Sequence, residues 1–148
     1  MAVSSVSLHT SPRPDSVYAA VGGHETFAAL VDAFYASAVE DAPFIAMYPE
    51  GTEIEGAKWR LCAFLEQYFG GPTTYSEQRG HPRLRMRHMP FAVTPEARDR
   101  WLHHMRGALD SIELPPMYDE LMWDYFQRAA AAMINQPGEG RPQPSPLI

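Results

Sequence analysis

Apolar residues recur at steps of three and four along four segments of this 148-residue chain, with polar residues between them. This spacing places the apolar side chains on one face of a helix, which must then be buried. It predicts helices over residues 24–39 and 53–69, a third from Thr94, and a last one over 118–134. The predicted inward positions are Phe27, Leu30, Val31, Phe34, Tyr35, Ala38, Ala57, Leu61, Phe64, Leu65, Tyr68, Ala97, Trp101, Met105, Ala108, Ile112, Leu121, Met122, Tyr125, Phe126, Ala129 and Met133. No segment sustains the alternation of a strand, so the predicted class is all-α.

Glycines, prolines and capping residues mark the predicted helix ends. A short first element begins at Asp15 or Ser16 and stops at Gly22-Gly23. The prolines of segment 41–52 predict a packed corner, and Gly70-Gly71-Pro72 ends the second long helix. Thr94 can cap the third long helix with proline in its first turn. We expect the stretch from 70 to 82 to be irregular.

The chain predicts a single domain between two tails. Residues 1–14 are rich in Ser and Pro without apolar periodicity, and residues 136–148 hold four prolines and two glycines. Such composition is typical of disordered extensions. The remaining 15–135 has the size of one ordinary domain.

Composition narrows the class of partner and the location. A formal net charge of −6 disfavours nucleic acid, and no apolar run is long enough to span a bilayer. The first residues lack the basic flank and apolar block of a secretory signal, and one cysteine, Cys62, cannot form an internal disulfide. We therefore expect a cytoplasmic protein without nucleic-acid or membrane partners.

One of the six histidines, His88, is the candidate metal ligand. It lies among apolar residues directly after three arginines: its neighbours are Arg83, Arg85, Met86, Arg87, Met89 and Phe91. Haem needs this combination, because its iron takes an axial nitrogen, its macrocycle needs apolar walls and its propionates pair with arginine. On residue types alone, a half-buried histidine bonded to a carbonyl remains the favoured interpretation. A zinc site is a poorer interpretation of His88, because the sequence contains no HxxxH or CxxC spacing.

The other histidines and three aromatic residues admit simpler interpretations. His24 is expected to be a polar surface group, and His103 and His104 are both expected on the surface. Tyr35, Tyr48 and Trp101 are either core aromatics or donors that line one cavity. Their spacing does not decide between these alternatives.

The chain resembles the truncated haemoglobins of group II, or O type, over residues 16–136. The resemblance rests on Tyr18-Ala19-Ala20-Val21-Gly22-Gly23, Phe34-Tyr35, Tyr48-Pro49-Glu50, FLEQYFGGPTTYSEQRGHPRLRMRHMPF (64–91) and Arg98-Asp99-Arg100-Trp101. It implies a globin-like two-over-two helical sandwich around haem b (iron protoporphyrin IX). It also implies that His88 is the proximal iron ligand.

The resemblance further implies the roles of the other site residues. Tyr35, Tyr48 and Trp101 would stabilise the ligand on the distal side. Ala57 would stand where conventional globins place a distal histidine, with Leu61 one turn further along the helix. The further cofactor contacts would be Arg60, Phe64, Tyr75, Arg87 and Phe91, with the two arginines and the tyrosine facing the propionates.

These roles lead to two expected functions. Three donors aimed at dioxygen predict reversible binding with slow release, which argues against simple transport. Carbon monoxide, nitric oxide or peroxide would be further ligands. The alternative is a haem redox enzyme with nitric oxide dioxygenase or peroxidase-like activity. Such an enzyme would depend on an external reductase, because the sequence has no GxGxxG motif at the start of a helix to bind a flavin or nicotinamide. The sequence also admits a homodimer.

Overall fold

The computed structural model describes residues 16–46, 54–80 and 94–134, and these residues are helical with no strand. The helices are α1 (Val17–Ala20), α2 (His24–Ala38), α3 (Ala42–Ile45), α4 (Ile54–Tyr68), α5 (Thr74–Arg79), α7 (Pro95–Ile112) and α8 (Pro116–Ala132). The predicted all-α class is confirmed. The last helix begins two residues earlier than predicted, because Pro116 has the backbone angle of a first helical residue. None of these helices is long and apolar enough to cross a membrane.

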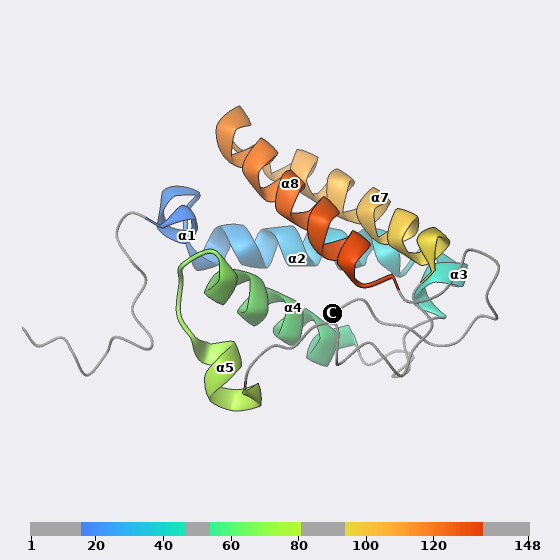
Figure 1. The fold of residues 1–148 in the computed structure, drawn as a ribbon, viewed down its shortest axis with the longest axis horizontal. Coiled ribbons are helices and arrows are strands. Elements are labelled where there is room, and N and C mark those ends of the chain that lie inside the picture. The colour runs from blue at the N-terminus through green and yellow to red at the C-terminus, as the bar shows by residue number, and fades with distance from the viewer. Residues whose placement is uncertain (1–15, 47–53, 81–93, 135–148) are drawn as a thin grey trace, which may run out of the picture.

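Two layers of two helices form the molecule. In Figure 1, α2 and α4 make one layer, and α7 and α8 cross over it as the other. Helix α2 packs against both α4 and α7 and therefore joins the layers. This arrangement is the expected two-over-two sandwich.

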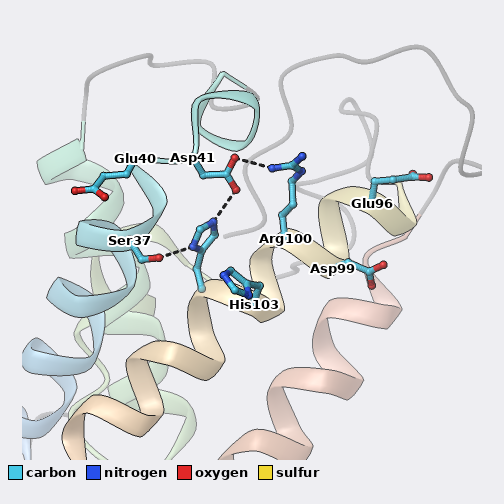
Figure 2. Close-up of a pocket in the computed structure, with 8 residues that line it drawn as sticks. Ser37, Glu40, Asp41, Glu96, Asp99, Arg100 and His103 are labelled. Carbon is cyan, nitrogen blue, oxygen red and sulfur yellow. Dashed lines mark hydrogen bonds and ion pairs between the residues drawn. The ribbon is translucent and has the colours of Figure 1, made fainter.

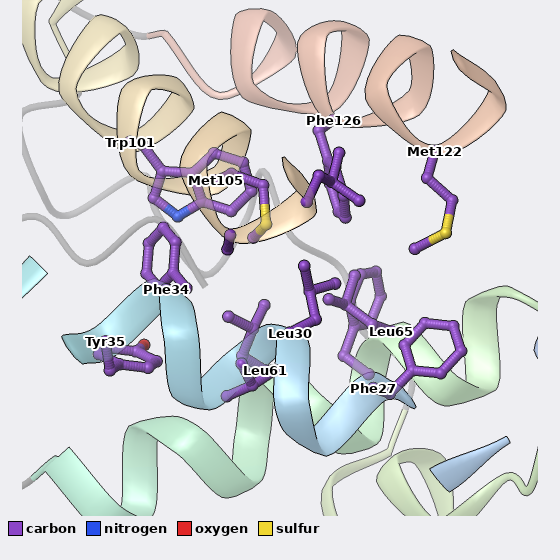
Figure 3. Packing of buried hydrophobic residues seen from close by; sticks show 14 of the residues in the cluster. Phe27, Leu30, Phe34, Tyr35, Leu61, Leu65, Trp101, Met105, Met122 and Phe126 are labelled. Carbon is purple, nitrogen blue, oxygen red and sulfur yellow. The ribbon is translucent and has the colours of Figure 1, made fainter. Parts of the chain in front are cut away.

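The predicted apolar faces meet between the layers. Phe27, Leu30, Leu61, Met105 and Phe126 are each 0% exposed, and Figure 3 shows that they come from both layers. Burying side chains of this size stabilises the fold by about 1.5–3 kcal/mol each. These contacts hold the helices in fixed positions around the candidate site.

Two residues of the predicted stripes are exposed, and two more, Ile112 and Ala129, are only partly buried. Tyr68 is 50% exposed, because its ring stacks on Tyr125 at a centroid distance of 4.0 Å and leaves one side open to solvent. Leu121 is 43% exposed, whereas its neighbour Met122 is fully buried. Adjacent helical residues diverge by about 100°, so only one of this pair faces the core.

The stretch predicted to be irregular contains a short helix, α5. Its sequence shows little apolar periodicity, but contacts with α4 hold it in place. The side chain of Gln67 accepts a hydrogen bond from the Ser76 amide at 2.9 Å and donates one to the Ser76 hydroxyl at 2.8 Å. Tyr75 packs its ring edge against Phe64. The prediction was wrong over residues 74–79 because tertiary contacts outweighed local sequence preference.

Candidate haem pocket

Five of the predicted pocket residues lie in one buried cluster between the layers. Tyr35 on α2, Ala57, Leu61 and Phe64 on α4, and Trp101 on α7 are each at most 4% exposed. The positions of Tyr35, Leu61 and Trp101 can be followed in Figure 3. The fold therefore brings these residues to the same core. Of the other six predicted residues, Arg60 and Tyr75 belong to the described residues, and the remaining four lie outside them: Tyr48, Arg87, His88 and Phe91.

Trp101 is the buried donor in this cluster. Its ring lies 5.4 Å from that of Phe34 and 5.8 Å from that of Phe126, centroid to centroid, so both layers hold it. Its side chain is 3% exposed, yet the indole Nε1 donates no hydrogen bond to any residue in the described ranges. A buried N–H without an acceptor costs about 1–3 kcal/mol. The indole can therefore donate to an acceptor that the described residues do not supply.

Two of the three predicted propionate contacts, Arg60 and Tyr75, are described, and they lie on α4 and α5. Arg60 is half-buried on α4. Tyr75, on α5, is 3% exposed and packs against Phe64, with the Arg79 guanidinium 5.9 Å from its ring centroid. Both residues make contacts with the polypeptide. Their role toward a cofactor stays a prediction.

The described residues fit haem. Apolar faces of α2, α4, α7 and α8 provide the dry walls that a macrocycle needs, and Trp101 supplies an unsatisfied donor among them. Among Tyr35, Ala57 and Leu61 only the tyrosine is polar. The distal candidates therefore offer donors among apolar side chains rather than a strong base.

The structure corrects the expectation for His104, which is buried and 4% exposed. Its Nδ1 lies 2.6 Å from the Ser37 hydroxyl of α2, and its Nε2 lies 2.8 Å from Asp41 Oδ2 (Figure 2). A carboxylate only accepts, so Nε2 carries a proton and donates it to Asp41. The signal for this position was present in the sequence, because residue 104 falls one helical turn after Trp101 on the inward face. His103 is exposed as expected.

Asp41 is the anionic centre of this network. Its Oδ1 accepts hydrogen bonds from Arg100 Nη1 at 2.6 Å and from the Phe44 amide at 3.3 Å, which caps α3. Burial alone would raise the pKa of this carboxyl, but the hydrogen bonds from His104, Arg100 and the amide hold the pKa below its ordinary value. The network therefore favours a charged Asp41.

An open hollow of about 640 Å³ lies beside the network on the polar side of α7. Its lining residues are Ser37, Glu40, Asp41, Glu96, Asp99, Arg100, His103 and His104. None of them is a predicted haem contact. The hollow is therefore distinct from the candidate haem pocket.

Comparisons with known proteins agree with this arrangement. Residues 16–135 match the family described as bacterial-like globin. The chain is 36% identical over 114 residues to a group 2 truncated hemoglobin of Bacillus subtilis, covering 77% of this chain and 85% of the relative. A thermostable hemoglobin of Thermobifida fusca is similar with 51% identity and a TM-score of 0.79, over 81% of this chain and 97% of its own. The group II truncated hemoglobin of Bacillus anthracis is similar with 32% identity and a TM-score of 0.80, over 86% and 96% of the two chains. The chain therefore belongs to the bacterial-like globin family, among its group II truncated haemoglobins.

Proposed function

We propose that this globin binds dioxygen and other diatomic ligands reversibly and releases dioxygen slowly. Membership of the family implies haem-based binding of diatomic gases. The finer proposal concerns the residues that hold the ligand, which are Tyr35, Tyr48 and Trp101. We propose haem b as the cofactor.

The observation that carries this proposal is the unsatisfied indole of Trp101. A buried N–H that finds no acceptor among the described residues gains a full hydrogen bond when a polar ligand enters the pocket. Haem, when bound, supplies an iron that takes up a diatomic ligand and increases the negative charge on its outer atom. The indole and the two phenols would donate to that atom and slow its departure.

The remaining site residues would hold the cofactor. His88 would provide the axial nitrogen, with Phe91 and Phe64 as apolar walls. Arg60, Arg87 and Tyr75 would pair with the propionates, for which guanidinium is well suited. Ala57 and Leu61 would keep the distal side apolar.

Replacement of Trp101 by Phe tests the distal assignment. The change keeps an aromatic ring but removes the donor, so dioxygen should dissociate about tenfold faster, since one net hydrogen bond contributes about 1–1.5 kcal/mol. The matched control is Trp123→Phe, because Trp123 is only partly buried on α8 and has the Arg106 guanidinium 4.9 Å from its ring centroid. Stopped-flow measurement of dissociation gives the comparison. Equal rates in wild type and Trp101→Phe would remove Trp101 from the donor set.

Replacement of His88 by Ala tests the axial ligand. The absorption spectrum typical of histidine-ligated ferrous haem should disappear, and haem should be retained less firmly. His103→Ala is the control, because His103 is exposed on α7. An unchanged ferrous spectrum in His88→Ala would refute the assignment.

The alternative function is that of a haem redox enzyme, oxidising nitric oxide to nitrate or splitting peroxide. A phenol with a pKa near 10 is a poor base for peroxide chemistry, so the donor set favours the binding function. Turnover would require an external reductase. Mixing the oxygen-loaded protein with nitric oxide separates the two functions: rapid consumption that a reductant renews would favour the enzyme, and a slow or single reaction would exclude it.

A further inference from the structure

Three side chains with metal-binding atoms converge where α2 begins and α4 ends. His24 is the first residue of α2, while Cys62 and Glu66 are one helical turn apart on α4. His24 Nδ1 lies 2.6 Å from Glu66 Oε2, and Cys62 Sγ lies 3.4 Å from the same oxygen. All three ligand atoms lie within 4.8 Å of one another. None of these residues belongs to the candidate haem pocket or to the His104 network.

Glu66 is an unusual residue for this position. It is only 9% exposed, and burial of a carboxylate is costly unless the charge is compensated. Its partners in the described part of the chain are His24 and Cys62, and both contact Oε2. The other oxygen, Oε1, accepts no hydrogen bond from the described residues, and no Lys or Arg among them pairs with it. A buried carboxyl group whose second oxygen has no partner among the described residues leaves one oxygen available to a metal ion.

The mixture of ligand atoms selects the class of cation. Thiolate, imidazole and carboxylate together suit Zn²⁺, whereas Mg²⁺ and Ca²⁺ prefer oxygen ligands throughout. Zinc bonds of about 2.0–2.3 Å in a tetrahedron separate the ligand atoms by roughly 3.3–3.7 Å. The nitrogen and oxygen that are now 2.6 Å apart would have to separate by about 1 Å. The side chain of His24 is 69% exposed and therefore has room to rotate.

We propose that His24, Cys62 and Glu66 form a second metal site that binds Zn²⁺, with water in the fourth position. The ion would replace the proton of the Cys62 thiol and the proton between His24 and Glu66, and both would pass to solvent. Sequence spacing does not reveal such a site, because His24 and Glu66 are 42 residues apart. The bound ion would clamp the start of α2 to the end of α4.

Equilibrium dialysis of the full-length, haem-loaded protein against zinc chloride, followed by metal analysis, tests the stoichiometry and the ligands. We expect about one Zn²⁺ per chain that depends on this site. His24→Ala, Cys62→Ala and Glu66→Gln should each weaken its binding at least about tenfold. Glu25→Gln is the matched control for charge, because Glu25 is an exposed carboxylate beside His24, and His103→Ala is the control for imidazole. Both controls should bind like wild type.

The single cysteine of the chain provides a second readout, which can be measured first on the wild-type protein. Burial and then the charge of Glu66 raise the pKa of the Cys62 thiol to about 12, so the thiol is protonated in the metal-free chain. Saturating Zn²⁺ should slow alkylation of wild-type Cys62 at least about tenfold, and a chelator should restore the rate. His24→Ala should abolish this protection, while Glu25→Gln should retain it. An alkylation rate unaffected by Zn²⁺, or Zn²⁺ binding unaffected by His24→Ala and Cys62→Ala, would overturn the proposal.

Discussion

A single buried side chain, His104, joins three segments of the chain. Its ring nitrogens contact Ser37 at the end of α2 and Asp41 at the start of α3, while its backbone belongs to α7. Because both nitrogens have partners, the ring is buried without an unsatisfied polar atom. The same α7 carries Trp101 one turn earlier. The network therefore fixes the helix that carries the Trp101 indole.

Replacement of Asp41 by Asn should destabilise the protein by about 1.5–3 kcal/mol near neutral pH, because charge-assisted hydrogen bonds to His104 and Arg100 are lost. Since the pKa of Asp41 is lowered in the folded protein, its contribution is present above the ordinary value of 3.8 and is lost as pH falls through the folded pKa. The difference in the free energy of unfolding between wild type and Asp41→Asn should therefore stay constant from about pH 7 to about pH 5. It should disappear only below pH 3.8. Urea unfolding at several pH values measures it.

Asp99→Asn is the control for this prediction. Asp99 is 69% exposed and pairs with Arg98, so its loss should change the free energy of unfolding by less than about 0.5 kcal/mol. A difference between wild type and Asp41→Asn that already narrows between pH 7 and pH 5 would contradict the role given to Asp41.

Residue types and spacing predicted the core positions well but not the polar partners. Trp101 was placed on the inward face of its helix by periodicity alone, whereas His104 was assigned to the surface. A histidine gives no indication in the sequence of whether a distant serine and aspartate will meet it. The same holds for His24 and Glu66, whose contact depends on the packing of α2 on α4.

The junction between α1 and the end of α4 depends on a glycine at position 71. A Cβ built there would lie 2.7 Å from Tyr18 Cδ1 and 2.9 Å from the Glu66 carbonyl oxygen. Tyr18 also donates its amide proton to the Phe69 carbonyl at 2.9 Å. The close approach of these two elements therefore leaves no space for a side chain at residue 71.

Replacement of Gly71 by Ala should destabilise the protein by about 1–3 kcal/mol, because Tyr18 or the backbone must shift. Gly107→Ala is a matched comparison, since its Cβ would meet nothing within 4 Å in the middle of α7. That change should stabilise the protein by about 0.5–1 kcal/mol through the better helix propensity of alanine. Thermal and urea unfolding of both variants measure the contrast. Equal effects of the two substitutions would exclude the steric explanation.

The element boundaries show which features local sequence controls. Ser16 and Thr94 cap α1 and α7 as predicted, with side-chain oxygens 3.1 Å from the amides of Ala19 and Ala97. Helix α5 was not predicted, because its stability comes from Gln67 and Phe64 on another helix. Helix ends that depend on residues within one turn could therefore be predicted from the sequence. Contacts between elements could not.

The sandwich as a whole is built from the segment that matches the globin family. The buried cluster joins α2 and α4 to α7 and α8, and its residues all lie between Tyr18 and Met133. The family match covers residues 16–135. The arrangement of the two layers depended on the resemblance, because periodicity identifies a buried face but not the helix that it meets.

We propose that residues 15–135 fold and bind haem without the two tails. A chain shortened to this range should keep the haem spectrum and unfold within about 1 kcal/mol of the full-length protein, because it keeps every residue of the buried cluster. A chain that starts at Gly23 is the matched control: it loses Tyr18, whose ring stacks on Phe27 and whose amide bonds to Phe69. Loss of this aromatic side chain should cost about 3–5 kcal/mol. Urea unfolding, followed by circular dichroism and haem absorption, compares the stability of the three chains. A large loss of stability on removing residues 1–14 and 136–148 would show that the tails belong to the folded unit.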